Sequence, residues 1–250
     1  MDYSIVIPAF NEANKITATL TAVTTFMRSY APSFNVFVSD DGSKDATAQL
    51  VEDFAKNNPE VILLKNKHKG KGYAVYSGVQ AADGDLIYIA DADLSAPIGE
   101  LRKLSVWIKD QGFDVVIASR EGTGAQRVDE PFYRHLMGRV FNFWVRTIAL
   151  PGIKDSQCGF KLFTKTSAKE IFNRLKIYGQ EAKELDKAYL GAFDVEVLYL
   201  ARKHKYKIKE VPVIWTYVKT NRLNPLQDSI KMAMDVLKVR FNDLRGLYSI

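Results

Sequence analysis

Short apolar runs and longer amphipathic stretches alternate through the first half of the chain. The runs are rich in β-branched residues, which favour strands; they are Ile5-Val6-Ile7, Val36-Phe37-Val38, Val61-Ile62-Leu63-Leu64, Leu86-Ile87-Tyr88-Ile89 and Val115-Val116-Ile117. Between them, apolar residues recur at helical spacing, in the groups Ile16, Leu20, Val23, Met27, then Leu50, Val51, Phe54, then Leu101, Leu104, Ile108. Strands that alternate with helices predict an α/β fold, a mostly parallel central sheet with helices on both faces.

The second half of the chain follows a less regular pattern and closes on a long amphipathic stretch. Its expected elements are helices over residues 132–150 and 195–203, strands over 159–163 and 208–217, and a final helix from about Pro225. A chain of 250 residues, 47% of them hydrophobic, is large enough for one well-buried core. Since no internal repeat or Gly/Ser linker divides it, we expect a single domain over residues 1–250.

Polar clusters follow three of the expected strands, each at the carboxyl end of its strand. Asn11 and Glu12 come after the first strand, the run Asp40-Asp41-Gly42-Ser43 after the second, and the run Asp91-Ala92-Asp93 after the fourth. The carboxyl ends of parallel strands meet at one edge of an open α/β sheet, and ligands bind in the crevice outside that edge. The three clusters therefore predict a binding site there.

The run Asp91-Ala92-Asp93 brings two carboxylates together directly after an apolar strand. Carboxylate oxygens are hard ligands that suit Mg²⁺ or Mn²⁺, and such an ion can also bridge the phosphates of a substrate. A metal in this place would neutralise charge on a diphosphate leaving group. The competing interpretation is a solvated turn after a strand.

Two further segments suit a nucleotide or another anion. The carboxylates of Asp40 and Asp41 could accept hydrogen bonds from a base or a ribose, whereas a tight turn with a helix cap at Ser43 or Asp45 would need no acidic pair. The basic, glycine-rich loop 67–72 opens a helix of small residues, which is a favourable place for an anion. An ordinary solvated basic loop is the alternative, and the spacing of a Walker loop is absent.

Composition narrows the partners and the compartment. A formal charge of +6 and a sequence pI of about 9.2 favour anionic partners, and no recognition motif points to nucleic acid. Cys158 is the only cysteine, so no intrachain disulfide can form; we expect a reducing compartment and a buried, unreactive thiol. The sequence contains neither a signal peptide nor an apolar run of bilayer length, so we expect a cytoplasmic protein whose membrane contact is peripheral.

Four motifs occur in an order that is shared with a known family. They are Ile7-Pro8-Ala9-Phe10-Asn11-Glu12, Asp40-Asp41-Gly42-Ser43, Gly70-Lys71-Gly72-Tyr73-Ala74 and Asp91-Ala92-Asp93. Together they resemble the inverting family-2 glycosyltransferases, which have the GT-A fold, and the resemblance covers nearly the whole chain. Residues 155–163, 193–199 and 210–215 are similar to the dolichyl-phosphate β-glucosyltransferase branch, and the polyprenyl-phosphate mannosyltransferases are close cousins.

The resemblance implies substrates, a metal and residue roles. The donor would be UDP-glucose, the acceptor a polyprenyl or dolichyl phosphate, and the metal Mg²⁺ or Mn²⁺. The implied nucleotide-sugar residues are Pro8, Ala9, Phe10 and Glu12 along the nucleotide, Asp40 at the base or ribose, Lys71 and Ala92 near the donor, and Asp91 at the sugar or the metal. Asp93 would hold the metal, and Arg120 and Arg134 would grip the acceptor phosphate. Residues 1–119 would form the nucleotide-sugar half, 120–224 the acceptor half and 225–250 a C-terminal amphipathic helix.

Two positions depart from the pattern of the cousins. Ser95 stands where the mannosyltransferases place a glutamine that assists the metal. Gly138 stands where a small hydroxyl residue near the acceptor phosphate is expected.

The acceptor decides whether a general base is required. A sugar hydroxyl needs one, whereas a phosphate monoester, with a second pKa of about 6, is largely a dianion at neutral pH and needs arginines to hold it in line. Asp155 and Asp194 are the candidates for a base or for orienting the acceptor, and Asp194 equally suits a helix cap. Transfer from a UDP-sugar to a saccharide hydroxyl, and a non-catalytic nucleotide-sugar binding module, are the alternative functions.

Two stretches combine an apolar face with basic flanks. One covers residues 138–150, and the other is the C-terminal helix with Leu226, Ile230, Met234, Leu237 and Phe241. Such faces suit helices that lie in a membrane interface, and they equally suit helices that face a core. Because a polyprenyl acceptor requires membrane contact, we expect a peripheral protein on the cytoplasmic face of a membrane.

Overall fold

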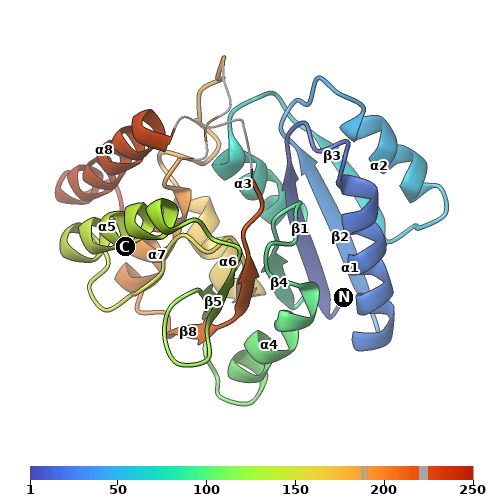
Figure 1. The fold of residues 1–250 in the computed structure, drawn as a ribbon, viewed down its shortest axis with the longest axis horizontal. Helices are drawn as coiled ribbons and strands as arrows, with labels where there is room; N and C mark the ends of the chain where they lie inside the picture. The colour runs from blue at the N-terminus through green and yellow to red at the C-terminus, as the bar shows by residue number, and fades with distance from the viewer. Residues whose placement is uncertain (187–188, 190, 220–224, 250) are drawn as a thin grey trace.

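A seven-stranded sheet forms the centre of the computed structural model (Figure 1), which describes residues 1–186, 189, 191–219 and 225–249, with the backbone alone for 225–227. The strand order is β3-β2-β1-β4-β7-β5-β8. The strands are β1 (Tyr3–Ala9), β2 (Phe34–Asp40), β3 (Val61–Lys65), β4 (Leu86–Ile89), β5 (Val115–Ser119), β7 (Lys161–Thr164) and β8 (Ile208–Pro212). β7 runs antiparallel to both of its neighbours and every other pair is parallel, which confirms the mostly parallel sheet.

Helices cover both faces of the sheet, as predicted (Figure 1). They are α1 (Ile16–Tyr30), α2 (Thr47–Ala55), α3 (Lys71–Ala81), α4 (Leu101–Lys109), α5 (Phe132–Ile148), α6 (Lys165–Asn173), α7 (Phe193–Lys203) and α8 (Pro225–Leu244), with a short 3-10 turn at Ile98–Glu100. Helices α1, α2 and α4 pack on one face, α3, α6 and α7 on the other, and α5 and α8 pack beside each other at the outside of this second layer.

The central strands are buried on both faces, so their sequences are continuously apolar rather than alternating. All seven residues of β1 are buried. Ile5 and Ile7 point into the core under α1 and α4, whereas Val6 points into the core under α3. Val6 fits there because Gly78 of α3 leaves room; a Cβ at Gly78 would lie 2.3 Å from the Val6 Cγ1 atom.

The single strand expected over residues 208–217 is wrong, because two strands occupy this stretch. Strand β8 ends at Pro212, and the next residue changes the pairing partner: the Val213 nitrogen still donates to the Ser119 carbonyl oxygen at 3.1 Å, while the Val213 carbonyl oxygen accepts from the Gln126 nitrogen at 3.1 Å. Beyond Val213 the chain forms β9 (Ile214–Thr216), which pairs in parallel with β6 (Gln126–Val128) in a separate two-stranded sheet. This turn away from the main sheet carries Trp215 and Tyr217 to the carboxyl edge where the polar clusters lie.

The pattern of apolar residues did not predict two short elements, β6 and α6. Strand β6 has three residues, none of them buried, and α6 has nine residues directly after β7. In the part of the chain that the structure describes, no helix is both long enough and apolar enough to cross a membrane.

Candidate active site

A cavity of about 530 Å³ lies at the carboxyl edge of the sheet, where the chain leaves β1, β4 and β9. Most of the predicted site residues line it: Pro8, Ala9, Phe10, Glu12, Lys71, Asp91, Ala92, Asp93, Arg120 and Arg134. Asp40, Asp155 and Asp194 are buried and are not among the described residues of its wall. The edge predicted from the sequence is therefore hollow and holds both acidic and basic groups.

Asp91 is fixed on two sides of its carboxylate. The Lys71 Nζ atom lies 2.5 Å from the Asp91 Oδ1 atom. Gly159 lies against the same carboxylate so closely that a Cβ on it would be 2.1 Å from the Oδ2 atom. Burial lowers the pKa of Lys71, but the carboxylates of Asp91 and Asp194 outweigh it and raise that pKa to about 12. Lys71 is therefore a fixed positive charge beside Asp91.

Asp93 is oriented by its neighbour Ser95, the residue that departs from the mannosyltransferase pattern. The Oδ1 atom of Asp93 accepts from the Ser95 backbone nitrogen at 3.0 Å and from its hydroxyl at 2.6 Å. No donor among the described residues reaches the Oδ2 atom, which is left to bind a ligand.

The acidic pair fits a divalent ion that binds together with a substrate. No group of three or more histidine, cysteine, aspartate or glutamate side chains within the described residues could hold a metal. Mg²⁺ commonly binds through one or two carboxylates and the phosphates of a nucleotide rather than in an all-protein cage. Asp93 and Asp91 would hold such an ion, and a bound diphosphate would supply further oxygen ligands.

The other end of the cavity combines an aromatic stack with a buried acid. The rings of Phe10 and His68 are stacked, with centroids 4.3 Å apart and planes at 9°. The His68 Nδ1 atom lies 2.7 Å from the Asp41 Oδ2 atom, and Asp41 also accepts from the backbone nitrogens of Lys69 and Gly70. Burial raises the pKa of Asp41. Asp41 thus holds the basic loop against the cavity, a role that the sequence did not reveal.

The two members of the Asp40–Asp41 pair have different surroundings. The Asp40 Oδ2 atom accepts from the backbone nitrogen of Ser43 at 3.0 Å, while its Oδ1 atom is buried and has no hydrogen-bond partner among the described residues. At the start of α2, Asp45 accepts from the backbone nitrogen of Thr47 at 3.0 Å, whereas Ser43 accepts from that of Asn11. The N-cap position of α2 is Ala46, and no side chain caps the helix there, so the expectation of a helix cap at Ser43 or Asp45 is wrong.

Arg120 is anchored by a buried acid. Its Nε and Nη2 atoms lie 2.8 Å from the Oδ2 and Oδ1 atoms of Asp155, and its guanidinium lies 5.2 Å from the centre of the Trp215 ring. Burial raises the pKa of Asp155, but Arg120 outweighs it and holds that pKa well below its usual range. Asp155 therefore stays ionised as the partner of Arg120.

Arg134 has a different environment, although it lines the same cavity. Its guanidinium lies 5.3 Å from the centre of the Tyr217 ring, and no carboxylate of the described residues forms an ion pair with it. The hydrogen-bond donors of Arg134 are consequently available to an anion in a way that those of Arg120 are not.

Asp194 lies in a buried ion pair with Lys161. The Lys161 ammonium contacts the Asp194 Oδ1 atom and also donates to the Cys158 carbonyl oxygen at 2.5 Å. Helix α7 begins at Phe193 after Ala192, and no side chain caps it, so the expectation that Asp194 caps this helix is wrong. Burial raises the pKa of Asp194. Cys158 is buried, as expected.

Several residues of the cavity wall were not predicted: His68, Gln157, Gly159, Tyr189, Trp215, Tyr217 and Lys219. Trp215 and Tyr217 alternate along a strand-like stretch that follows a proline, which is the one signal that could have marked them. His68 has no neighbouring histidine or acid at metal-ligand spacing, so the sequence does not mark it as a site residue. Tyr189 lies in a segment without apolar periodicity.

Solved structures share this fold. Glucosyl-3-phosphoglycerate synthase from Mycobacterium tuberculosis, in complex with Mn²⁺, UDP and glucosyl-3-phosphoglycerate, matches with a TM-score of 0.63 at 19% identity, over 96% of this chain and 79% of that one. Mannosyl-3-phosphoglycerate synthase from Rubrobacter xylanophilus matches with a TM-score of 0.67 at 17% identity, over 98% and 74%. The fold is accordingly GT-A, as the sequence motifs predict.

Sequence comparison gives closer relatives. The dolichyl-phosphate β-glucosyltransferase of Dictyostelium discoideum is 34% identical, with 99% of this chain and 76% of the relative aligned. The human protein of the same name is 30% identical over 99% and 77%. The profile of the family described as Glycosyl transferase family 2 matches residues 4–172. Together with the cavity at the sheet edge, these matches show that the chain is a glycosyltransferase and belongs to glycosyl transferase family 2.

Proposed function

We propose that the chain transfers glucose from UDP-glucose to a polyprenyl or dolichyl phosphate, in a metal-dependent reaction that inverts the anomeric carbon. The observation that carries this proposal is one cavity whose wall presents the carboxylates of Asp91 and Asp93 as well as the guanidinium groups of Arg120 and Arg134. Acids for a metal-bound diphosphate and arginines for a second phosphate are what such a transfer requires. The relatives named dolichyl-phosphate β-glucosyltransferase support the same acceptor.

The donor would occupy the end of the cavity formed by the first half of the chain, residues 1–119. Phe10 and His68 offer an aromatic wall for the nucleoside, and Asp40 has a buried oxygen without a hydrogen-bond partner among the described residues. Asp93, with Asp91, would hold Mg²⁺ or Mn²⁺, which offsets charge on the departing diphosphate when bound. The Mn²⁺ and UDP in the mycobacterial synthase support this assignment.

The acceptor would enter from the side of Arg134, in the half formed by residues 120–224. Arg134 forms no ion pair with the described residues, so its donors can bond the phosphate, whereas Asp155 holds the Nε and Nη2 atoms of Arg120. Residues 220–224 lie outside the described part of the chain. We assign Arg134 to gripping the phosphate and Arg120 to fixing the electrostatic field around it.

The surroundings of the two candidate bases favour a phosphate over a saccharide hydroxyl. Asp155 is paired with Arg120 and Asp194 with Lys161, and both carboxylates are buried away from the cavity wall. A hydroxyl nucleophile needs a base within hydrogen-bond reach, whereas a phosphate dianion does not. We therefore propose that neither aspartate acts as a base.

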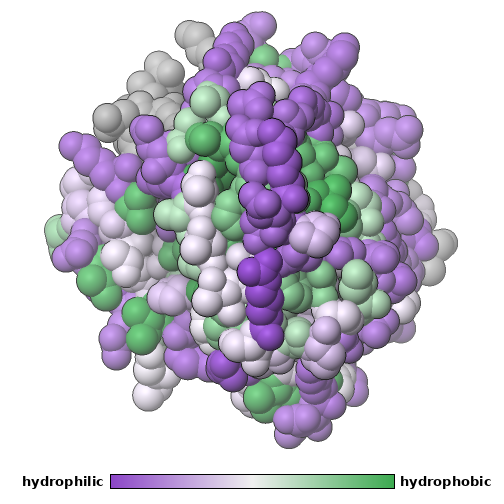
Figure 2. Space-filling model, turned by 90° about the vertical axis from the view of Figure 1, so that its right-hand side faces the viewer, coloured by the Kyte–Doolittle hydropathy of each residue, from purple (hydrophilic) through white to green (hydrophobic). Residues whose placement is uncertain are grey.

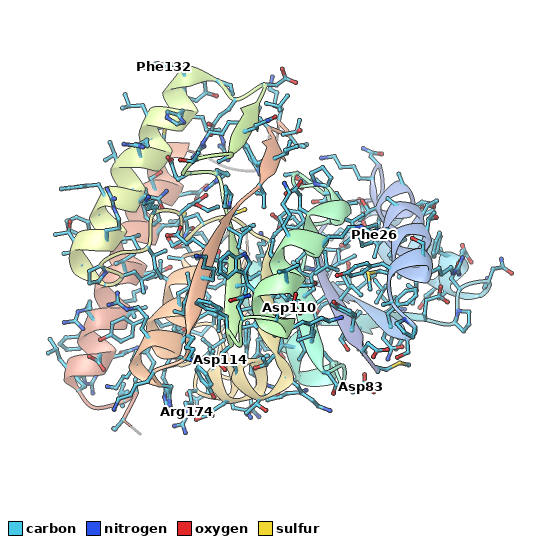
Figure 3. The ribbon with its side chains drawn as sticks, turned by 90° about the horizontal axis from the view of Figure 1, so that it is seen from below. Phe26, Asp83, Asp110, Asp114, Phe132 and Arg174 are labelled. Carbon is cyan, nitrogen blue, oxygen red and sulfur yellow. The ribbon has the colours of Figure 1, made fainter. Side chains whose placement is uncertain are left out.

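A lipid acceptor lies in a membrane, which would account for an apolar outer surface on α5 and α8. We call it the α5/α8 surface; its exposed side chains are Phe132, Tyr133, Leu136, Val140 and Phe143 on α5, and Ile230, Met234, Leu237 and Phe241 on α8. Phe132 stands at the outer end of α5, away from the sheet (Figure 3). The side chain of Leu226, also expected on this face, lies outside the described residues.

We propose that the α5/α8 surface lies on the cytoplasmic face of a membrane. Basic side chains on the same two helices, Arg139, Arg146, Lys231 and Lys238, and Arg245 directly after α8, complement anionic lipid. At the opposite end of the molecule, over α1 and α2, hydrophilic side chains form a central ridge and much of the rim (Figure 2). Arg134 belongs to both α5 and the cavity wall, so the lipid phosphate would approach from this side.

A donor panel tests the proposal. The protein would be incubated with UDP-glucose, UDP-N-acetylglucosamine, GDP-mannose or GDP-glucose, with Mg²⁺ or Mn²⁺, and with a short polyprenyl phosphate. We expect a glucosylated lipid phosphate from UDP-glucose and none after chelation of the metal. Lipid-linked sugar from no donor would overturn the proposal, and UDP binding without transfer or hydrolysis would favour a binding module.

A further inference from the structure

The inner side of α8 carries a buried acid that the proposed reaction does not use. Asp235 is 4% exposed, and its Oδ2 atom accepts from the hydroxyl groups of Tyr178 and Tyr189, the latter at 2.6 Å. Its Oδ1 atom accepts from the Lys238 ammonium at 2.9 Å. A buried carboxylate is costly unless its oxygens are hydrogen-bonded, so these donors hold α8 to the segment between α6 and α7.

The two tyrosines that bond Asp235 lie at or near the wall of the reaction cavity. Tyr189 is itself part of the cavity wall. Tyr178 packs against the start of α3, the helix that carries Lys71; a Cβ on Gly72 would lie 2.7 Å from the Tyr178 Cδ1 atom. The Tyr178 hydroxyl also accepts from the Ala192 backbone nitrogen at 2.7 Å, next to the start of α7.

The two hydroxyl groups remain donors over the whole physiological range. Burial and the neighbouring Asp235 carboxylate raise the pKa of Tyr178 well above its usual value, and the same causes raise the pKa of Tyr189. A shift of α8 therefore either breaks these bonds or moves Tyr189 with it.

The outer side of the same helix is the apolar row of the α5/α8 surface. Ile230, Met234, Leu237 and Phe241 are between 47% and 59% exposed. Lys231, Lys238 and, directly after the helix, Arg245 add positive charge along the side of this row that is next to Asp235. An apolar row with basic flanks complements an anionic bilayer surface, and docking there would fix the position of α8.

We propose that Asp235, Tyr178 and Tyr189 form a positioning network that couples the docking of α8 on an anionic bilayer to the shape of the reaction cavity. Docking fixes Tyr189 in the wall, and the acceptor then binds more tightly. This rests on the proposed transfer, and it adds that the lipid surface acts on the enzyme itself, besides concentrating the acceptor. Coupling between two sites typically changes affinity by about 5- to 150-fold.

The test separates the effect of the surface from that of a lipid acceptor. The acceptor is a five-carbon isoprenyl phosphate that stays in water, the donor is UDP-glucose, and vesicles contain either neutral lipid alone or neutral with anionic lipid. KM and kcat are measured with and without vesicles, and binding is measured by co-sedimentation. For the wild type, we expect anionic vesicles to lower the acceptor KM by about fivefold or more.

Two variants and a matched control locate the effect. Tyr189→Phe removes one hydroxyl and keeps the ring, and Asp235→Asn keeps the shape of the acid. Both should co-sediment like the wild type and lose the decrease in KM. Tyr199→Phe removes another tyrosine that bonds an α8 carboxylate, Asp243, outside the cavity wall, and it should keep the decrease.

Three results would overturn the coupling. They are a wild type that binds vesicles without any change in KM, a Tyr189→Phe variant that keeps the full change, and a Tyr199→Phe variant that loses it equally. If Asp235→Asn fails to fold, the Tyr189→Phe variant alone shows whether the decrease in KM depends on the network. Absence of transfer under every condition would instead overturn the proposed function, and the coupling with it.

Discussion

At the scale of single residues, the cavity edge depends on Gly159, whose role the sequence pattern around it does not reveal. Gly159 follows Cys158 in the strand-like stretch before β7, and its missing side chain leaves the space that the Asp91 carboxylate fills. Lys71 holds the same carboxylate from the other side. The position of Asp91 is therefore set by two residues from distant parts of the chain.

Substituting Gly159 should disable the enzyme without unfolding it. In Gly159→Ala the new methyl group would displace the Asp91 carboxylate, and misplacement by about 1 Å can lower the rate about 100-fold. We expect kcat to fall by that order while the melting temperature changes little. Gly138→Ala is the control, since no atom lies within 4 Å of a Cβ there. A fully active Gly159→Ala would contradict this account of Asp91.

Substituting the two cavity arginines should have different effects on the free energy of unfolding. Arg120→Ala leaves Asp155 buried without its partner, which costs about 3–5 kcal/mol in the free energy of unfolding. Arg134→Ala breaks no ion pair among the described residues, so it should raise the acceptor KM about tenfold or more with little loss of stability. Urea denaturation and steady-state kinetics check both. Equal destabilisation by the two substitutions would refute the assignment.

The Arg120–Asp155 pair also predicts a dependence on pH. Arg120 keeps the pKa of Asp155 below its ordinary value of 3.8 despite burial, so the unfolded chain takes up this proton first as the pH falls. The stabilising contribution is therefore complete above pH about 4 and is lost below it. We expect the difference in unfolding free energy between wild type and Asp155→Asn to stay constant from about pH 7 to about pH 5 and to shrink in stronger acid. A decline within the neutral range would speak against the pair.

At the scale of elements, the sequence predicted the long apolar strands and helices and missed the short ones. Strand β1 was predictable because burial on both faces makes it apolar throughout. Strands β8 and β9 look like one strand in the sequence, because the chain changes its pairing partner from β5 to β6 at Val213 without a break in the apolar pattern. That change of partner brings Trp215 and Tyr217 over the two arginines. Local patterns do not report such contacts between distant segments.

Charge substitutions on the outer side of α8 should weaken membrane binding without destabilising the fold. Leu237 and Phe241 are 47% and 59% exposed, so the double variant Leu237→Glu, Phe241→Glu should keep the melting temperature of the wild type. Its co-sedimentation with anionic vesicles should drop by about tenfold or more, because apolar burial and charge attraction are both lost. Val106→Glu, on the equally exposed α4, is the control. Unchanged co-sedimentation of the double variant would exclude α8 from the contact.

At the scale of the whole molecule, one sheet edge gathers groups that the sequence spreads over more than 200 residues. The motifs at residues 8–12, 40–43, 70–74 and 91–93 predicted the edge and its donor end, because each directly follows a strand or opens a helix there. The commitment of Asp155 and Asp194 to ion pairs could not be predicted, since Arg120 and Lys161 lie about 30 residues away in sequence. The absence of an accessible base at these two positions emerges only from the fold.

The most direct test of the central claim identifies the bond that the enzyme forms. Carbon-13-labelled UDP-glucose and a short polyprenyl phosphate would be incubated with the protein and Mn²⁺ or Mg²⁺, and the product examined by carbon and phosphorus NMR. The account predicts a β-anomeric carbon coupled to the acceptor phosphorus, formed by wild type and strongly reduced in Arg134→Ala. A glucose attached to a carbon-bound hydroxyl, or an α-anomeric product, would contradict it.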